Sequence, residues 1–485
     1  MTCFRLWLCV TRSIIAMSVL FLTAGPAIQA AQEIRVLQAG AFSSNITPAL
    51  GGLIIGGWAP IPATKIHDDL FAKCLVLDNG KTRLVFVVCD NLGLPREVCD
   101  AAKQIIHETT GIPMKNIMIS ATHTHSAVTA RGKNRLVQDE ALSEYQHFIV
   151  QRIADGVRCA VNNLEPAKIG WGGADEPASV FNRRWHLKPG TDIPNPFGGH
   201  DQVRMNPPSG SKDLLKPAGP TDPEIAFLSV LSTDGRPLAL LANYSLHYVG
   251  GVEKGDVSAD YFGMFADRIQ QLIKADRQSP PFVAMMSNGT SGNINNIDFT
   301  KKSKSIPRYQ KMREVAELTA QAVYTAYQNV EYKDWVELGA RQEDLTLHVR
   351  KPDQDMLHYF QNVLAKSDDE TPYHTHEKIY AQRVKQLDES PDQVDVPLQA
   401  LRVGDVGISA IPFEVFVEIG LELKEKSPFK HSFTVSLANG SYGYLPTVPQ
   451  HKLGGYETWM GTNIVEIEAA PKIVETLLDM QNALK

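Results

Sequence analysis

The sequence predicts an α/β fold in which one large domain carries a mixed, buried β-sheet flanked by helices. Short apolar runs, typical of strands buried on both faces, alternate with longer helical stretches along the chain. Asp78-Asn79-Gly80 and Asp234-Gly235 each stand between two apolar runs, which indicates β-hairpins and a sheet that is not purely parallel. Because no linker-like segment interrupts this pattern, we expect a single domain over residues 31–485.

The individual elements follow from the same patterns. The clearest strands are the apolar runs at residues 83–90, 116–120, 225–231 and 282–286. Ser258 is predicted as the N-cap of a helix with one apolar stripe, and Lys274 falls in its last turn. Residues 189–223 are rich in Pro, Gly, Ser and Asp and predict a lid or binding loop, whereas the charged stretch 350–395 predicts one or two exposed helices.

Composition and charge narrow the class of partner. The 485 residues are 43% hydrophobic and 21% charged, which excludes a disordered, collagen-like or polytopic membrane protein. Lys and Arg number 48 against 54 Asp and Glu, without a basic run, which argues against a nucleic-acid or anionic-membrane partner. We therefore expect a small or neutral molecule as the partner, and the sequence does not indicate an oligomeric state.

The first thirty residues have the composition of an export signal. Two arginines without an acid precede an apolar run from Ile14 to Ala24, and small residues follow up to Ala30. The run is shorter than the ~18 residues that span a bilayer. We expect a signal peptide over residues 1–30, cleavage near Ala30 and a periplasmic or secreted protein without a stable membrane span. The alternative is an uncleaved N-terminal anchor.

Four cysteines follow this segment, and their spacing does not predict a metal site, because no pair has the CxxC pattern. Cys74 and Cys89 lie on either side of the 78–80 hairpin, so a disulfide between them is one alternative in an exported protein. We favour buried free thiols, because Cys packs well as a small apolar residue.

The tripeptide His-Thr-His occurs twice, and local geometry separates the two copies. His123 and His125 follow the strand predicted at 116–120, and residues two apart on an extended segment point to the same side, so both imidazoles can face one site. His374 and His376 stand at the start of a predicted helix, where residues two apart diverge around the axis. We therefore expect a metal site at the first copy and a solvated surface at the second.

A catalytic zinc ion takes three or so N or O ligands and keeps one position open for water, so further ligands must come from elsewhere in the chain. His247 and Glu414 each follow another buried apolar run, and each is either a ligand or a satisfied buried polar group. Asp90, at the end of a predicted strand, either orients a ligand histidine or caps the strand. The segment 67–69 is a weaker candidate for the border of the site.

Five segments in one order resemble the neutral/alkaline (non-lysosomal) ceramidase family of zinc amidohydrolases. Residues 119–126 resemble the family's THTHS motif; the other matches are Asn182-Arg183, residues 243–247, residues 411–414, and Gly443-Tyr444 with Tyr456-Glu457. The resemblance implies a ceramidase-like catalytic domain of the N-terminal type, without the family's C-terminal immunoglobulin-like domain. It also implies Zn²⁺ bound by His123, His247, Glu414 and Tyr444, with His125, Arg183 and Tyr456 as catalytic residues at the substrate.

One segment departs from the family pattern. Where the family carries an active-site serine, this chain has Gly292-Asn293-Ile294-Asn295-Asn296, with Asn295 at the serine position. Asn295 is expected to act as a hydrogen-bond donor in the catalytic site, since an amide is not a nucleophile. Attack by zinc-bound water is therefore predicted in place of a serine-dependent route.

The resemblance implies an exported zinc-dependent hydrolase that cleaves the amide (N-acyl) bond of a small-molecule or lipid substrate, as a ceramidase does. Two alternatives stay open. One is a zinc hydrolase of a more polar substrate, such as a sugar-derived or short acyl amide or ester. Asn295 is one observation that favours this alternative. The other is a secreted binding protein that has the fold but no turnover.

Overall fold

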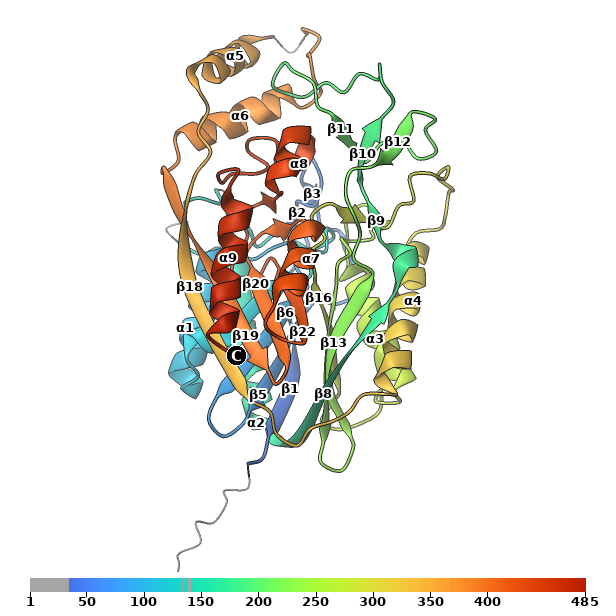
Figure 1. Cartoon of the computed structure of the whole chain (residues 1–485), viewed down its shortest axis with the longest axis vertical. Helices are drawn as coiled ribbons and strands as arrows, with labels where there is room; N and C mark the ends of the chain where they lie inside the picture. Colours follow the sequence, from blue (N-terminus) through green and yellow to red (C-terminus); the bar gives the residue numbers. More distant parts are fainter. Residues whose placement is uncertain (1–34, 133, 138–140, 368) are drawn as a thin grey trace, which may run out of the picture. The chain divides into compact units, whose positions relative to one another are not determined.

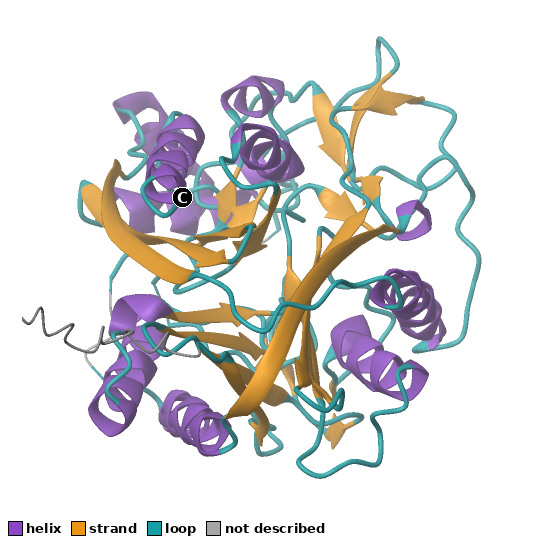
Figure 2. Ribbon diagram, turned by 60° about the horizontal axis from the view of Figure 1, so that its bottom comes forward, coloured by secondary structure: helices purple, strands orange, loops and turns teal. Residues whose placement is uncertain are grey.

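The main sheet is antiparallel in its centre and has a parallel pair at each edge (Figures 1 and 2). The computed structural model describes residues 35–132, 134–137, 141–367 and 369–485, so the expected signal peptide lies outside the described residues. The strand order is β16-β14-β13-β8-β1-β5-β6-β7. The strands are β1 (Gln38–Asn45), β5 (Phe71–Asp78), β6 (Arg83–Cys89), β7 (Ile117–Ala121), β8 (Glu165–Asp175), β13 (Glu224–Ser232), β14 (Pro237–Tyr244) and β16 (Val283–Asn288).

The two halves of this sheet repeat one order of elements. In each half, three strands are followed by a helix, a strand parallel to the third strand, and a second helix. The helices are α1 (Arg96–Thr110), α2 (Glu144–Asn162), α3 (Asp260–Leu272) and α4 (Gln310–Tyr327). The carboxyl ends of two parallel strands lie at the same edge of a sheet, so β6/β7 and β14/β16 each present two neighbouring loops there.

A second, four-stranded sheet in the order β18-β19-β20-β22 connects the two edges of the main sheet. Its strand β22 contacts both β7 and β16, and apolar side chains of both sheets share one core. The added elements are β18 (Leu338–His348), β19 (Gln393–Val403), β20 (Val406–Ile411), β22 (His431–Ser436), α5 (Gln354–Ala365), α6 (Glu377–Asp388), α7 (Val417–Lys426), α8 (Val448–Leu453) and α9 (Ala469–Asn482).

Short strands connect the loops beyond these sheets. β9 pairs with β17, β21 with β23, β4 with β15 and β2 with β3, while β10 pairs with β11 and β12. The remaining elements are β2 (Leu53–Ile54), β3 (Ile61–Pro62), β4 (Lys65–Ile66), β9 (Phe181–Asn182), β10 (Arg184–Leu187), β11 (Val203–Met205), β12 (Leu214–Pro217), β15 (Asp256–Val257), β17 (Ile294–Asn295), β21 (Glu414–Val415), β23 (Tyr444–Leu445), η1 (Met114–Asn116), η2 (Pro177–Ser179) and η3 (Tyr456–Thr458).

The structure confirms the predicted α/β class, the four strands and both hairpins, since β5 pairs antiparallel with β6 and β13 with β14. The predicted limits of α3 are wrong at both ends. The helix starts at Asp260 with Ala259 as N-cap, and Ser258, one residue earlier, accepts a hydrogen bond from the Asp260 amide through its Oγ at 3.0 Å. Lys274 lies beyond the last turn in a left-handed conformation with φ 60°.

The two segments without a clear strand pattern also have regular structure. Residues 189–223 contain β11 and β12, which pair with β10, so this segment is not a structureless loop. Residues 350–395 contain α5 and α6, as predicted, and both helices bury one side against the core around α9.

The four cysteines that follow residue 34 are free thiols, and Cys74, Cys89 and Cys99 are buried. The favoured interpretation of their role is therefore confirmed, and the Cys74–Cys89 disulfide does not form. The register explains why the two thiols do not meet: Cys74 pairs with Val87 across the hairpin, and Cys89 pairs with Ala72.

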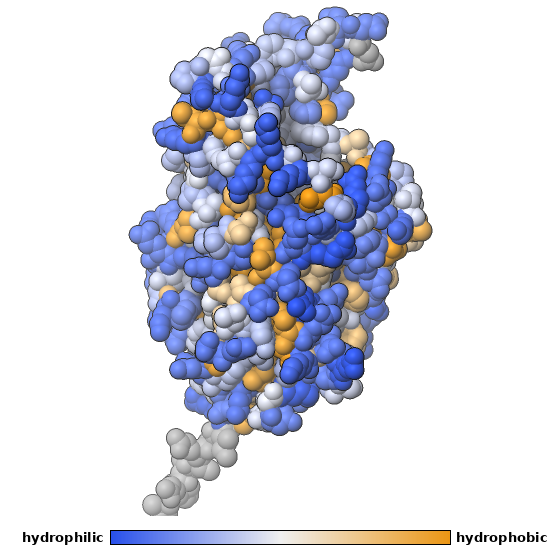
Figure 3. Space-filling view, turned by 90° about the vertical axis from the view of Figure 1, so that its right-hand side faces the viewer, coloured by the Kyte–Doolittle hydropathy of each residue, from blue (hydrophilic) through white to orange (hydrophobic). Residues whose placement is uncertain are grey.

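None of the helices in the described part of the chain is both long and apolar enough to cross a bilayer. The face drawn in Figure 3 is mostly hydrophilic, and its apolar residues form small areas between polar ones. This distribution is ordinary for a protein surface and does not mark a broad apolar patch on that face.

We expect Gly40→Ala to destabilise the fold, because β1 lies directly against α2 at this position. A Cβ on Gly40 would be 2.1 Å from the Ala160 carbonyl oxygen, and backbone cannot move away as a flexible side chain does. The free energy of unfolding should fall by about 1–3 kcal/mol, measured by urea denaturation. Gly57→Ala is the control, since no heavy atom lies within 4 Å of its added Cβ. Equal stability of the two variants would contradict the expected clash.

Candidate metal centre

Three histidines from the carboxyl ends of two strands converge on one point. His123 and His125 follow β7, and His247 follows β14. The Nε2 atom of His123 lies 3.1 Å from His247 Nε2 and 3.1 Å from His125 Nε2. Each of the three residues offers one ligand atom, and these atoms all lie within 4.8 Å of one another. The first His-Thr-His motif therefore does face one site, as predicted.

The backbone that achieves this convergence is not the expected extended segment. His123 has φ 72°, in the left-handed region that a residue with a Cβ rarely adopts. The His123 amide donates to the Asn91 carbonyl at 2.9 Å, which ties the strained residue to the loop after β6. Strain of this kind persists where the surrounding structure fixes it, as at ligand-binding sites.

Hydrogen bonds fix the tautomers of His123 and His247. His123 Nδ1 donates to the Leu92 carbonyl at 2.7 Å, and His247 Nδ1 donates to the Ser291 carbonyl at 3.1 Å. In the neutral rings both Nε2 atoms therefore carry lone pairs, which face each other at 3.1 Å. Two facing lone pairs repel unless a proton or a cation lies between them, so the arrangement fits a metal ion.

A carboxylate and a phenol join this cluster through a short pair of strands. β21 and β23 run parallel, with Glu414 opposite Tyr444 in register. Glu414 Oε2 lies 3.3 Å from His123 Nε2 and 4.0 Å from His247 Nε2. Two imidazoles and a carboxylate are an ordinary zinc ligand set, so the donor chemistry matches Zn²⁺. His123 and His247 belong to the cluster whether Glu414 or His125 is the third ligand.

The protonation states suit metal binding. Burial lowers the pKa of His247 well below its usual value, and the nearby positive charge of Arg183 adds to the effect. Burial likewise lowers the pKa of His125, with His123 as the second cause. Burial alone would raise the pKa of Glu414, but His123 and Arg131 outweigh it and hold that pKa well below the usual range. At neutral pH His125 and His247 are therefore neutral imidazoles and Glu414 is an ionised carboxylate, the forms that bind metals.

Arg183 connects the metal cluster with a buried ion-pair network. Its Nη2 donates to the Tyr444 hydroxyl at 3.1 Å and to the Gly292 carbonyl at 2.7 Å. Its Nε donates to Glu457 at 3.0 Å, and Glu457 also accepts from Arg184 at 2.7 Å. Burial would lower the pKa of Arg183, but Tyr444 and Glu457 raise it, so the guanidinium stays charged. Arg183 of the predicted Asn182-Arg183 pair thus lies at the site, whereas the Asn182 amide donates to the Pro220 carbonyl at 3.0 Å.

Tyr456 separates the metal cluster from an open cavity of about 410 Å³. Its ring is 5.8 Å from that of Tyr444 and 5.9 Å from that of Trp459, both in edge-to-face contact. Burial raises the pKa of Tyr456, so its phenol is protonated at neutral pH and can donate a hydrogen bond. Part of the predicted binding loop, around residues 192–206, lines the same cavity.

The prediction for the second His-Thr-His motif is wrong. α6 begins at Glu377, so His374 and His376 precede the helix, and the helical divergence assumed for them does not apply. Their ring centroids are only 5.4 Å apart, and the His376 ring stacks on Trp58 at 3.7 Å. Both histidines are half-buried and line the cavity beside Tyr456 instead of facing open solvent.

The side chain of Asn295, a predicted catalytic residue, forms hydrogen bonds with neighbouring residues of the protein. Its amide nitrogen donates to Asn206 Oδ1 at 2.8 Å, and its Oδ1 accepts from the Ile297 amide at 2.9 Å. Asn206 in turn lines the cavity beside Tyr456. The structure therefore places Asn295 behind Asn206, where it holds a residue of the cavity wall.

The idea that Asp90 orients a ligand histidine is wrong. Its Oδ2 accepts from the Phe71 amide at 3.0 Å and lies 3.4 Å from Lys73 Nζ, so the carboxylate caps the strand end. Backbone carbonyls perform the orienting role instead. Residues 67–69 line a different cavity together with Asp90, so they do not border the metal cluster.

Three residues of the site escaped the sequence reasoning. Tyr248 stacks on His125 with 3.7 Å between ring centroids and 15° between planes, and its position next to His247 was the available signal. Glu457 stands in the sequence only as the neighbour of Tyr456, although its buried carboxylate pairs with two arginines. Arg131, whose Nη2 lies 3.7 Å from Glu414 Oε1, carries no sequence signal at all.

Comparisons with known proteins identify the family and the fold of the chain. A family model described as neutral/alkaline non-lysosomal ceramidase, N-terminal, matches residues 38–305, more than half of the chain. A structure of a ceramidase complexed with C2 has a TM-score of 0.68 at 17% sequence identity, covering 93% of this chain and 75% of that one. The neutral ceramidase from Pseudomonas aeruginosa has a TM-score of 0.67 at 18% identity, covering 93% and 74%. The predicted resemblance and fold are confirmed.

We expect the metal-free protein to lose stability as the pH falls below about 6.5. Above that pH, His125 and His247 are neutral in the folded and the unfolded chain. Below it, the unfolded chain binds protons that the buried rings do not, so the free energy of unfolding falls. From about pH 4.5 downward the contribution of ionised Glu414 is lost as well, because its folded pKa is depressed.

The melting temperature of chelator-treated protein, measured from pH 8 to pH 4, checks this expectation. His247→Asn removes one of the buried titrating rings and should flatten the curve between about pH 6.5 and 4.5. A wild-type melting temperature that stays constant over that interval would show that these rings do not control acid stability.

Proposed function

Because the chain belongs to the neutral/alkaline non-lysosomal ceramidase family, we propose that it is an exported, zinc-dependent hydrolase of ceramidase type that cleaves an amide (N-acyl) bond. The observation that carries the proposal is the convergence of His123 Nε2, His247 Nε2 and Glu414 Oε2 on one point. We assign Zn²⁺ to His123, His247, Glu414 and Tyr444. When bound there, Zn²⁺ acts as a Lewis acid and lowers the pKa of a water molecule toward ~7.

The protein's own groups have separate tasks in this proposal. His125 is neutral at neutral pH, so it can take a proton from the attacking water and pass it to the leaving amine. The protonated phenol of Tyr456 and the charged guanidinium of Arg183 stabilise the oxyanion that develops on the substrate carbonyl. Tyr248 holds the His125 ring by stacking, and Asn295 supports the cavity wall through Asn206.

The signal peptide over residues 1–30 and the catalytic domain over residues 31–485 are part of the same proposal. The basic flank, short apolar run and small residues before Ala30 support export. N-terminal sequencing of the protein recovered outside the cytoplasm tests it, and a retained Met1 would contradict cleavage near Ala30.

A second candidate substrate class is favoured by the polar lining of the cavity beside Tyr456. Asp192, Asp201, Arg204 and Asn206 face this cavity together with its aromatic wall. Such a lining suits a polar acyl amide or ester at least as well as a ceramide. A test of activity therefore needs both ceramide and polar acyl amides or esters as substrates.

We expect the purified protein to hold about one zinc ion per chain and to hydrolyse an N-acyl substrate. His123→Ala and His247→Ala should each lose the metal and lower turnover by at least about 10²-fold, because each removes a ligand. Metal content is measured by inductively coupled plasma mass spectrometry, and amine release is measured with ceramide and with polar N-acyl amides and esters. His348→Ala, on the exposed end of β18, is the matched control.

The outcome distinguishes the three alternatives. Release of sphingoid base from ceramide supports a ceramidase. Turnover of the polar compounds alone supports the second substrate class, polar acyl amides or esters. A protein that contains no zinc and turns over none of the panel would overturn the enzymatic proposal and leave a binding protein.

Arg183→Ala should lower turnover by about 10²–10³-fold while the zinc content stays near one per chain. The variant removes a charge that stabilises the oxyanion, but the imidazole and carboxylate ligands stay in place. Arg184 still pairs with Glu457 at 2.7 Å, so the buried carboxylate keeps a partner. Arg183→Lys keeps the charge without the two-pronged geometry and should recover only part of the activity. Loss of zinc from Arg183→Ala would show that the residue instead holds the metal site together.

A further inference from the structure

An apolar hairpin lies beside the candidate metal centre. Residues 48–63 contain no charged residue, and the Trp58 indole is their only side-chain group that can form a hydrogen bond. Strands β2 and β3 pair antiparallel within this segment, with Leu53 opposite Pro62 and Ile54 opposite Ile61. A strand with one buried face ordinarily has polar side chains on its other face, but this hairpin has apolar ones on both.

The outer face of the hairpin is exposed. Ile54 is buried and pairs with Val128 in an isolated bridge, so its neighbours on either side point away from the protein. Four large apolar side chains within residues 50–58 are between 40% and 56% exposed: Leu50, Leu53, Ile55 and Trp58. We call these four side chains the hairpin surface. Exposed apolar residues gathered in this way are typical of an interaction site.

The hairpin contacts the candidate metal centre directly. A Cβ on Gly56 would lie 2.4 Å from the carbonyl oxygen of His125, so the two backbones touch. The Trp58 ring is 5.6 Å from the Tyr456 ring in edge-to-face contact and stacks on His376 at 3.7 Å. All three of these aromatic residues line the cavity of about 410 Å³ beside the cluster. The hairpin surface therefore borders the mouth of the candidate substrate cavity.

Positive charge borders the same surface. Ile55 lines a cavity of about 350 Å³, and the described residues around it include Arg131, Arg135 and Arg383 but no Asp or Glu. The guanidinium carbon of Arg383 also lies 5.8 Å from the centre of the Trp58 ring. Within the described part of the chain, neither Arg135 nor Arg383 forms an ion pair. Both charges are thus available to an external partner.

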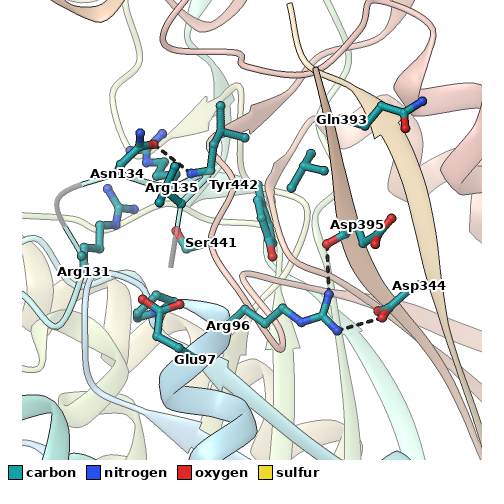
Figure 4. Close-up of a pocket in the computed structure, with 15 residues that line it drawn as sticks. Arg96, Glu97, Arg131, Asn134, Arg135, Asp344, Gln393, Asp395, Ser441 and Tyr442 are labelled. Carbon is teal, nitrogen blue, oxygen red and sulfur yellow. Dashed lines mark hydrogen bonds and ion pairs between the residues drawn. The ribbon is translucent and has the colours of Figure 1, made fainter. Parts of the chain in front are cut away.

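The acidic residues nearby belong to a different cavity, of about 420 Å³ (Figure 4). Arg135 also lines that cavity, but Asp344 accepts a hydrogen bond there from Arg96 at 2.8 Å. Glu97 and Asp395 line it as well, so its charges are mixed. Positive charge therefore prevails on the side of Arg135 that faces the hairpin.

A lipid surface fits this combination better than a protein does. Protein interfaces have roughly one hydrogen bond per 100–200 Å², but the hairpin offers only one side-chain donor, and its Leu53 carbonyl already accepts from the Thr129 amide at 3.0 Å. A bilayer needs no such partners: aliphatic side chains enter it, Trp lies at the head groups, and arginines attract lipid phosphates. The net charge of −6 opposes adsorption of the whole molecule, so the attraction must be local.

We propose that the hairpin surface docks this protein on a phospholipid bilayer, with Arg135 and Arg383 facing the lipid phosphates. The docking itself is independent of zinc, because none of these residues is a proposed metal ligand. Its consequence rests on the proposed function. Since Trp58 borders the candidate substrate cavity, docking turns the mouth of that cavity toward the lipid and favours an N-acyl lipid over a polar substrate.

The test is sedimentation of the purified protein with phosphatidylcholine vesicles, with and without about 30% phosphatidylglycerol. Wild type should bind both, and the anionic vesicles more tightly. Leu53→Asn and Ile55→Asn should each weaken binding to both by about tenfold, because apolar area is lost. Arg135→Gln should weaken binding by about fivefold, to the anionic vesicles alone. Leu318→Asn is the matched control, since Leu318 is 44% exposed on α4 and should bind as wild type does.

Wild type that sediments with neither kind of vesicle would overturn the proposal, as would folded Leu53→Asn and Ile55→Asn variants that bind like wild type. Circular dichroism verifies the folding of each variant. Light scattering tests the other occupant: a wild-type dimer that dissociates in Leu53→Asn would show that a second copy covers the surface, and would also overturn the proposal.

Kinetics test the consequence for the substrate. Leu53→Asn should lower turnover of ceramide in vesicles and leave turnover of a water-soluble, short-chain N-acyl substrate unchanged. An equal loss on both substrates would contradict a docking role for Leu53. Vesicle binding decides the docking even for a protein without turnover, so its failure is distinct from failure of the proposed function.

Discussion

Two imidazole nitrogens that face each other at 3.1 Å, the Nε2 atoms of His123 and His247, are the constraint around which this molecule is organised. His123 and His247 belong to strands near opposite ends of the eight-stranded order, so the sheet must curve for the two rings to meet. Strand β22 fills the gap, because it contacts both edge strands. The backbone carbonyls of Leu92 and Ser291 then fix each ring by accepting from Nδ1. The fold thus holds in place an arrangement that is repulsive unless a proton or a cation lies between the two rings.

Much of this arrangement can be predicted from short stretches of the sequence. Buried strands, hairpins and the ends of strands are short-range patterns, and the polar residue that follows a buried strand is a natural candidate for a site. His123, His247 and Glu414 were found in this way, and the order of the five segments added Arg183 and the two tyrosines. Such signals depend on a few neighbouring residues and do not require the topology.

The residues that the sequence did not indicate depend on contacts between distant segments. His376 stacks on Trp58, more than three hundred residues earlier, so its half-buried position cannot be read from the charged stretch around it. Arg131 is one arginine in a polar segment until the fold brings it to Glu414. Asn295 has contacts that its place in a motif did not indicate: its amide nitrogen donates to Asn206 and its carbonyl oxygen accepts from the Ile297 amide.

Glu414 contacts His123, which the sequence indicated, and Arg131, which it did not. These surroundings explain why a buried carboxylate is stable there. Burial alone would raise the pKa of Glu414, but the charges of His123, which faces Oε2, and of Arg131, which faces Oε1, lower it. A carboxylate held ionised in this way is a strong ligand for a cation on one side. On the other side it balances the guanidinium charge of Arg131, whose Nη2 lies 3.7 Å from Glu414 Oε1.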